Sequence, residues 1–210
     1  TVLSQTPSAF YQLITAQRQK QASFALRYIV FGGEALSFEQ VRRWFDDNPA
    51  DGAQLVNMYG ITETTVHVTY RPITRADLDP SSRARSPIGA RIPDLGVRVL
   101  DPGLNPVPPG VAGELYIAGD GLARGYLNRS GVSAARFVAH PFGGAGERAY
   151  RTGDIVRRNH SGDLEFIGRN DFQVKVHGFR VELGEIDAAL AELARVAYAV
   201  TVPRHDSGIG

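Results

Sequence analysis

Hydrophobic positions near the start of the chain follow the spacing of a helix. Thr6 and Pro7 form a helix start, because threonine caps free backbone donors and proline fits the first turn. Phe10, Leu13 and Ile14 then recur at the three- and four-residue spacing of one buried face. This pattern predicts an amphipathic helix that begins at Pro7.

The next apolar runs alternate between strand and helix lengths. Tyr28–Phe31 predicts a short buried strand that ends at a glycine pair. Ser37–Gln40 has the spacing of a capping box and opens a second helix that includes Trp44 and Phe45. Gln54–Met58 predicts the following strand. Strand, helix and strand in this order indicate an α/β fold with parallel strand pairing.

The middle of the chain changes character. Residues 71–92 are rich in proline, serine and arginine, and we expect them to be irregular. Beyond them, short apolar runs are separated by clusters of Gly, Pro, Asn and Asp, the pattern of hairpins in an all-β, barrel-like region. These runs are Val97–Leu100, Gly113–Ala118, Ala149–Arg151, Ile155–Arg158 and Leu164–Ile167.

The end of the chain predicts a strand and then a helix. Polar and apolar residues alternate along Gln173–Gly178, the period-two rhythm of a half-buried strand. After Val181 we expect a helix with Glu185 in its first turn. Its apolar face consists of Leu183, Ile186, Leu190 and Leu193. The run Val196–Val202 resembles a further strand.

Composition narrows the possible partners. The 210 residues are 43% hydrophobic, and 23 basic against 22 acidic residues give a net charge of +1. We therefore expect no nucleic-acid partner, and no membrane partner either, because no apolar run approaches the ~20 residues of a span. The chain has no cysteine, which excludes disulfides and cysteine-based zinc sites and is compatible with the cytoplasm, where we expect it to act.

Four motifs stand in order along the chain. They are Asn57–Glu63 (NMYGITE), Gly113–Leu127 (GELYIAGDGLARGYL), Tyr150–Ile155 (YRTGDI) and Gly168–Asp187 (GRNDFQVKVHGFRVELGEID). Together they closely resemble signature motifs of the adenylate-forming superfamily. Their residues are similar to those of adenylation domains from nonribosomal peptide synthetases. The resemblance covers nearly the whole chain. Because both ends look cut, at Thr1 and Gly210, we expect an internal fragment of such a domain.

The resemblance implies an activity and a division into parts. The parent protein would be an ATP-dependent ligase that forms an aminoacyl adenylate and loads a carrier-protein phosphopantetheine thiol. Its partners would be an amino acid and the carrier-protein and condensation domains of the same synthetase. Residues 1–95 would end a large α/β portion, 96–170 would form a β-barrel subdomain, and 171–210 would begin a small α+β lid. Asp171 matches the hinge.

The first motif offers groups suited to ATP and Mg²⁺. Tyr59 presents an aromatic face to adenine, and Gly60 lets the base approach the backbone. Thr62 carries a hydroxyl for a phosphate oxygen, and Glu63 a hard oxygen ligand for Mg²⁺. The resemblance implies the same roles and places Asn57 at the adenine edge. An ordinary loop with a packed tyrosine and a solvated glutamate is the alternative.

Later residues complete the proposed nucleotide site. Asp154 has the chemistry to accept hydrogen bonds from both ribose hydroxyls, although an Asp after Gly is often only a turn residue. Arg169 suits ribose and phosphate binding, because guanidinium binds such groups in fork geometry. Phe166 either closes the other side of the adenine or is a core strand residue. Arg180 resembles a second arginine that one lid orientation brings towards the phosphates or the thiol. We interpret Gly113–Leu127 as scaffold.

Substrate choice is only partly encoded in this stretch. The resemblance places the amino-acid pocket at Ala9, Val30, Gly32, Met58, Val66 and His67. This set is similar to that of domains that select threonine or another small polar amino acid. Ala9 departs from the polar residue that threonine selection favours. The aspartate that binds the substrate amine in this family would lie upstream.

Two charged elements of the family are missing from the sequence. The phosphate-binding loop would precede Thr1, and the lysine that bridges carboxylate and ATP would follow Gly210. We therefore expect the 210-residue chain alone to be inactive, because losing one preorganised charge already costs on the order of 10²–10³ in rate. Two alternatives stay open: an acyl-CoA or aryl-acid ligase of the same superfamily, and a non-catalytic remnant.

Overall fold

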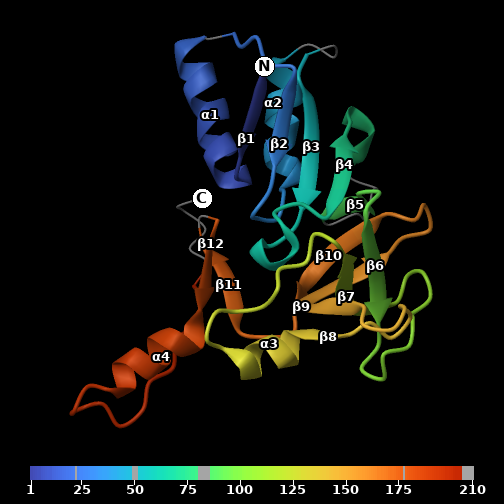
Figure 1. The fold of residues 1–210 in the computed structure, drawn as a ribbon. Helices are drawn as coiled ribbons and strands as arrows, with labels where there is room; N and C mark the ends of the chain where they lie inside the picture. Colours follow the sequence, from blue (N-terminus) through green and yellow to red (C-terminus); the bar gives the residue numbers. More distant parts are fainter. Residues whose placement is uncertain (22, 49–51, 80–85, 177, 205–210) are drawn as a thin grey trace.

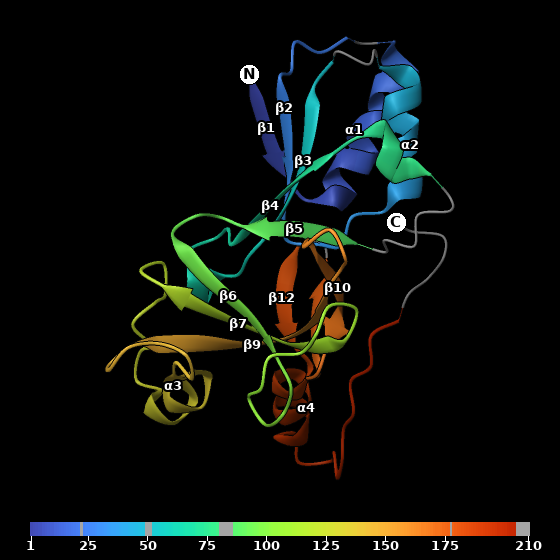
Figure 2. The same ribbon diagram turned by 90° about the vertical axis from the view of Figure 1, so that its right-hand side faces the viewer.

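The N-terminal part of the protein is a parallel sheet covered by two helices. A computed structural model describes residues 1–21, 23–48, 52–79, 86–176 and 178–204. Strands β1, β2 and β3 pair in parallel, and helices α1 and α2 lie together on one side of them (Figures 1 and 2). The bounds are β1 Val2–Gln5, α1 Pro7–Lys20, β2 Tyr28–Phe31, α2 Phe38–Asp47 and β3 Gln54–Tyr59.

The two helix starts differ in their capping. Thr6 is the N-cap of α1, with its side chain accepting a hydrogen bond from the amide of Ala9, and Pro7 is the first helical residue, as predicted. Ser37 precedes α2 but makes no side-chain cap. Its amide instead donates to the hydroxyl of Tyr11 at 2.8 Å. The capping-box spacing thus located the helix correctly, while the predicted cap itself does not form.

Residues 71–92 are more regular than the sequence suggests. They include most of β4 (Thr69–Ile73), the 3-10 turn η2 (Arg75–Leu78) and β5 (Pro87–Arg91), while residues 80–85 lie outside the described ranges. The prediction of an irregular segment was therefore wrong. Proline is tolerated at Pro72 because, among the described residues, β4 pairs there only with β3.

One sheet continues through the rest of the body. Its strand order is β1-β2-β3-β4-β5-β10-β9-β7-β6, with β8 paired to β9. The two predicted runs at Ala149–Arg151 and Ile155–Arg158 form a single long strand, β9. The described strands make an open path, so the expected barrel-like closure is not observed in them. The remaining bounds are β6 Leu95–Leu100, β7 Ala112–Gly119, α3 Ser130–Arg136, β8 Phe137–Ala139, β9 Arg148–Arg158 and β10 Leu164–Arg169.

The C-terminal part projects from this body. Strands β11 (Gln173–Val176) and β12 (Phe179–Glu182) form a separate two-stranded sheet, here called the lid hairpin, and helix α4 (Leu183–Ala191) follows. His177, part of the predicted strand pattern, lies outside the described residues. In Figure 1 helix α4 extends away from the sheets.

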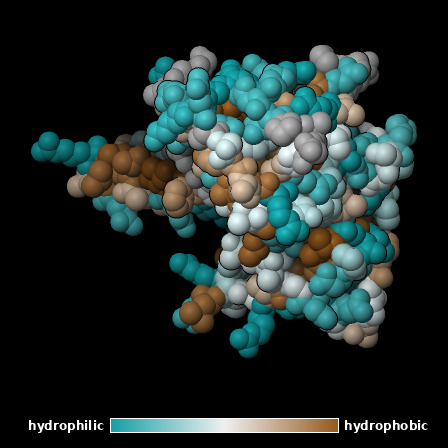
Figure 3. Space-filling view, turned by 90° about the horizontal axis from the view of Figure 1, so that it is seen from above, coloured by the Kyte–Doolittle hydropathy of each residue, from teal (hydrophilic) through white to brown (hydrophobic). Residues whose placement is uncertain are grey.

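Helix α4 exposes most of its predicted apolar face. Leu183 is buried, but Ile186 and Leu190 are exposed, and Leu193 lies beyond the helix end. The arm that extends from the body in Figure 3 carries hydrophobic surface. The run 196–202 forms no strand in the structure, contrary to the prediction, because no described strand lies beside it to supply hydrogen bonds.

Three apolar clusters fill the described part of the body, the smallest of them around Leu100 and Tyr116. The first packs α1 and α2 against the parallel strands, with Phe10, Phe31 and Trp44 at its centre. The second lies between β3 and the antiparallel strands and includes Tyr59 and Val156. No helix in the described ranges is long and apolar enough to cross a membrane. The division at residues 95/96 and 170/171 stays a prediction, and the main sheet runs without interruption past the first of these points.

Candidate functional site

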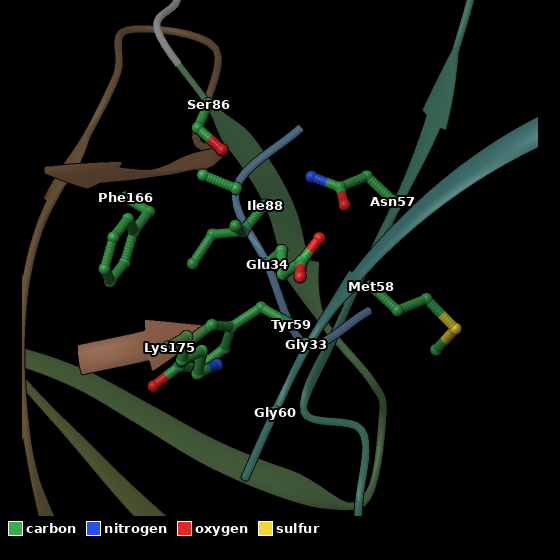
Figure 4. Close-up of a pocket in the computed structure, with 11 residues that line it drawn as sticks. Gly33, Glu34, Asn57, Met58, Tyr59, Gly60, Ser86, Ile88, Phe166 and Lys175 are labelled. Carbon is green, nitrogen blue, oxygen red and sulfur yellow. The ribbon is translucent and has the colours of Figure 1, made fainter. Parts of the chain in front are cut away.

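A pocket lies where strand β3 ends and the chain turns towards the antiparallel strands. Its empty volume, including space open to solvent, is about 410 Å³. In Figure 4 Phe166 of β10 faces this space from one side and Asn57 of β3 from the other. We call it the nucleotide pocket; its lining includes Gly33, Glu34, Asn57, Met58, Tyr59, Gly60, Ser86, Ile88, Phe166 and Lys175.

Tyr59, Asp154 and Arg169 form a buried charged network beside this pocket. The Tyr59 hydroxyl donates to one oxygen of Asp154, and Nη1 of Arg169 donates to the other at 2.5 Å. Asp154 is only 2% exposed. Burial raises the pKa of Asp154, an effect that Arg169 opposes. Burial and the neighbouring Asp154 carboxylate raise the pKa of Tyr59 well above its ordinary value. The structure thus brings together three predicted residues from β3, β9 and β10.

Asp171 holds the start of the lid hairpin to the same network. Both of its oxygens accept from Arg169, each at 2.7 Å, and Oδ2 also accepts from Arg136 at 3.0 Å. Although burial alone raises it, the pKa of Asp171 is lowered by these arginines. A side chain at Gly153, where φ is +76°, would lie 2.8 Å from this carboxylate. The predicted hinge residue is therefore firmly anchored in this arrangement.

Glu63 is buried and its two carboxylate oxygens differ. Oε1 accepts from the Tyr126 hydroxyl at 2.5 Å, the Tyr150 hydroxyl at 3.0 Å and Nη1 of Arg180 at 2.5 Å. Oε2 is buried and has no hydrogen-bond partner among the described residues. Burial alone raises the pKa of Glu63, but Tyr126 and Arg180 outweigh it, so the pKa is lowered. A carboxylate that is ionised and half-unpartnered fits a divalent cation.

A second pocket adjoins the first and is open to solvent. We call it the substrate pocket; its lining includes Ser4, Gln5, Thr6, Gly32, Gly33, Met58, Gly60, Ile61, Thr62, Val66, His67, Gln173, Lys175, Gly178 and Arg180. Four of the six predicted substrate residues line it. Ala9 is exposed on α1, and neither Ala9 nor Val30 lines this pocket. Thr62, exposed at the start of the 3-10 turn η1 (Thr62–Thr64), also lines it, and its role as a phosphate ligand stays a prediction.

His67 packs closely inside the substrate pocket. A Cβ at Gly32 would lie 3.4 Å from its ring. Its Nδ1 is buried without a partner among the described residues. Burial lowers the pKa of His67, so the ring is neutral near pH 7 and its Nδ1 can act as a hydrogen-bond donor or acceptor for a polar ligand.

The loop after β3 is tightly folded. A Cβ at Gly60 would lie 2.0 Å from the carbonyl oxygen of Val66, so only glycine fits there. Thr65 and Val66 have φ values of 58° and 70°, unusual for β-branched residues. Backbone strain of this kind clusters at functional sites. Gly60 thus has a structural requirement in addition to the predicted approach of a base.

Asn57 and Phe166 line the nucleotide pocket as predicted. The side-chain amide of Asn57 donates to the carbonyl of Pro87 at 2.8 Å, which fixes its orientation. Phe166 is half-buried, packs against the second apolar cluster and lines the pocket, so its contact with adenine stays a prediction.

Three residues lie at the site although the sequence motifs did not predict a role for them. Tyr126 and Tyr150 contact Glu63 from segments far away in the chain, and Tyr126 belongs to the motif interpreted as scaffold. Lys175 pairs with Arg180 in the lid hairpin and lines both pockets. Burial, with Arg169 and Arg180 nearby, lowers the pKa of Lys175. Its place in a strand of alternating residues gave no sign of this location.

Comparison with known proteins identifies the family. The model for the AMP-binding enzyme family matches residues 1–127. The dimodular nonribosomal peptide synthase of Bacillus subtilis (strain 168) is 54% identical over 209 residues, covering 98% of this chain and 9% of that protein. Syringomycin synthase SyrB1 of Pseudomonas syringae pv. syringae is 45% identical, covering 100% of this chain and 33% of its own length.

Solved structures agree with this assignment. The chain superimposes on PA1221, a nonribosomal peptide synthetase protein containing adenylation and PCP domains, with a TM-score of 0.85 and 34% identity, covering 99% of this chain and 41% of PA1221. The fold is thus that of an α/β adenylation-domain structure, and the sequence resemblance is confirmed. The chain belongs to the AMP-binding enzyme family. It spans a third or less of the two curated relatives described above.

Proposed function

We propose that this chain is part of an ATP-dependent ligase that activates an amino acid as its adenylate and passes it to a phosphopantetheine thiol. The observation that carries the proposal is the pair of adjoining pockets with ionised groups between them. Adenylate formation brings a carboxylate to the α-phosphate of ATP, and two anions approach each other only where cations offset their repulsion. Lys175 lines both pockets, and Arg180 lines the substrate pocket.

The nucleotide pocket would bind adenosine. Adenine would lie between Tyr59 and Phe166, with Asn57 at its edge and the ribose hydroxyls donating to Asp154. The arginine beside Asp154 keeps that carboxylate available as an acceptor despite its burial. Thr62 and Arg169 would hold phosphate oxygens. The resemblance supports these roles; Asn57, Tyr59 and Phe166 line the nucleotide pocket, while Thr62 lines the substrate pocket.

Glu63 would hold Mg²⁺ through its unpartnered oxygen. Magnesium usually binds one or two carboxylates together with substrate phosphates, and it offsets phosphate charge during transfer. Tyr126 and Tyr150 would keep the carboxylate in position.

The substrate pocket would select a small polar amino acid such as threonine. Gly32 leaves space in front of the neutral His67, whose free nitrogen suits a hydroxyl. Carrier-protein and condensation domains would be the partners of the whole protein, and the cytoplasmic location stays a prediction. PA1221 contains adenylation and PCP domains, which supports the carrier partner.

Two assays test the proposal. The longer polypeptide that carries this chain should catalyse pyrophosphate exchange that depends on an amino acid and prefers a small polar one. The chain itself should bind AMP, and Asp154→Asn should weaken that binding by about tenfold or more. Asp101→Asn, in an exposed turn, should leave it unchanged.

Contrary results have clear meanings. Exchange with aryl or fatty acids in place of amino acids would favour an acyl-CoA or aryl-acid ligase. No exchange with any acid, together with unaltered AMP binding in Asp154→Asn, would refute the proposal. Circular dichroism spectra of both variants would show that each is folded.

A further inference from the structure

Glu63 is held by contacts from the body of the protein and by one contact from the lid hairpin. Tyr126 and Tyr150 belong to the body, and the backbone carbonyl of Glu63 accepts from the amide of Ala123 at 2.8 Å. Arg180 instead comes from β12 of the lid hairpin. The lid hairpin shares no strand pairing with the main sheet among the described residues. Movement of the hairpin would therefore remove Arg180 and leave the other contacts in place.

Arg180 already occupies the position of a counter-cation. Its Nη1 lies 2.5 Å from Oε1 of Glu63, which also accepts from the hydroxyls of Tyr126 and Tyr150. Oε2 is buried and therefore closed to a hydrated ion in this arrangement. A divalent cation at Glu63 would also stand close to a guanidinium of like charge.

A second acidic group is available to Arg180 when it leaves. Oε1 of Glu182, two residues along the same strand, lies 3.8 Å from its Nε. The arginine thus keeps a carboxylate on its own hairpin, which lowers the cost of leaving Glu63.

We propose that Arg180 and a divalent cation exclude each other at Glu63, so that metal binding there is coupled to release of the lid hairpin from the body. The inference rests on the proposed role of Glu63 as a metal ligand. It makes Arg180 a gating residue: with the hairpin docked, Arg180 neutralises Glu63, and with the hairpin released, Oε2 of Glu63 can bind the ion without a competing guanidinium.

Mn²⁺ binding to the purified chain tests the competition directly. Mn²⁺ is added as a paramagnetic substitute for Mg²⁺, and its affinity is measured by water-proton relaxation. Arg180→Gln should tighten binding by about tenfold, because it removes the competing cation, and Glu63→Gln should abolish binding at the site. Arg151→Gln removes another partly exposed arginine from a carboxylate, Glu114, and should leave the affinity unchanged.

Hairpin position gives a second readout. The chain has no cysteine, so Ala16→Cys in α1 and Ala188→Cys in α4, both exposed positions, accept a pair of fluorescent dyes selectively. Saturating Mg²⁺ should change the energy transfer between them, and Arg180→Gln should show the changed value without metal. The Arg151→Gln variant should respond to Mg²⁺ as the parent chain does.

The possible failures are distinguishable. Equal Mn²⁺ affinity in the parent chain and Arg180→Gln, with binding lost in Glu63→Gln, overturns the coupling but retains Glu63 as the metal ligand. Unchanged binding in Glu63→Gln overturns both the coupling and the metal role. Energy transfer that ignores Mg²⁺ while Mn²⁺ binds at Glu63 overturns the hairpin release.

Discussion

The N-terminal core and the lid hairpin are held in place by different forces. In the core, the ring of Phe10 lies 4.8 Å from that of Phe31 and 5.1 Å from that of Trp44, all of them buried. At the hairpin, large apolar residues are exposed to solvent: Phe172, directly before β11, is 86% exposed, and Phe179 in β12 is 75% exposed. Charged pairs at its start and along β12 connect it to the body.

Apolar packing makes the structure of the core permanent, whereas ion pairs make the attachment of the hairpin reversible. Apolar packing loses its contacts only when the core opens, and the cost grows with the cavity created. An ion pair can exchange one partner for another of the same charge at little net cost. A site that needs a fixed base and a movable cover would therefore use packing for one and charge pairs for the other.

Truncation of Phe10 gives the largest expected effect. Phe10→Ala should lower the free energy of unfolding by about 3–5 kcal/mol, because a fully buried ring leaves a cavity between two helices and the sheet. Phe172→Ala, the same change in the hairpin, should alter it by less than about 0.5 kcal/mol. Urea unfolding followed by circular dichroism measures both. Similar losses in the two variants would contradict the comparison.

Removal of Arg169 tests charge in the interior. Arg169→Met should cost about 3 kcal/mol, because it leaves Asp154 buried without its cation. Arg18→Met breaks an exposed pair with Asp47 and should cost about 0–1 kcal/mol. Urea midpoints of the two variants give the answer. A small loss in Arg169→Met would mean that Asp154 becomes protonated without penalty.

A methyl group at Gly60 should strain the loop beside both pockets. Gly60→Ala should cost about 2 kcal/mol and weaken AMP binding, since the new Cβ would meet the carbonyl of Val66 at 2.0 Å. Gly168→Ala is the matched control, because nothing lies within 4 Å of its added Cβ. Thermal unfolding with and without AMP distinguishes a strained loop from a wholly destabilised chain. Equal melting temperatures would show that the loop relaxes freely.

The sequence predicted the core more completely than the connections around the site. Thr6 and Pro7 predicted the start of α1 correctly, because capping and proline geometry depend on local backbone chemistry. Phe10 and Ile14 are buried, as their spacing indicates. Residues 71–92 misled, because proline and serine content says little about a strand whose partners lie elsewhere in the chain. The pairing of β4 with β3 decided its structure.

For the site, local motifs named residues but not their partners. Tyr59, Asp154 and Arg169 were each predicted for nucleotide binding, and they do lie together. Tyr126 was missed, because its partner Glu63 is 63 positions away and tyrosine in a glycine-rich motif has no distinctive spacing. The location of Lys175 could not be predicted for the same reason, because only the folded hairpin places this residue beside both pockets.

Alkaline pH should weaken the body by way of its buried tyrosines. Burial raises the pKa of Tyr150, and burial with Asp154 nearby raises that of Tyr59, while tyrosines of the unfolded chain ionise near 10. Above pH 10 the unfolded state therefore releases protons that the folded state keeps. Stability present below pH 10 should fall by about 1.4 kcal/mol per pH unit for each of these tyrosines as pH rises further. Urea unfolding at pH 8 to 11 should show a shallower slope in Tyr150→Phe.

The smallest effect is expected on helix α4. Leu190 is 41% exposed, so Leu190→Ser removes little buried area and should change the free energy of unfolding by less than about 0.5 kcal/mol. Leu55→Ala, at a fully buried position of β3, should cost about 2–5 kcal/mol by comparison. The exposed face should instead affect association: sedimentation velocity should show less self-association in Leu190→Ser. If Leu190→Ser lowers the free energy of unfolding by more than about 1 kcal/mol, this face packs against the chain itself. The difference between the core and the C-terminal part would then apply to the hairpin and not to helix α4.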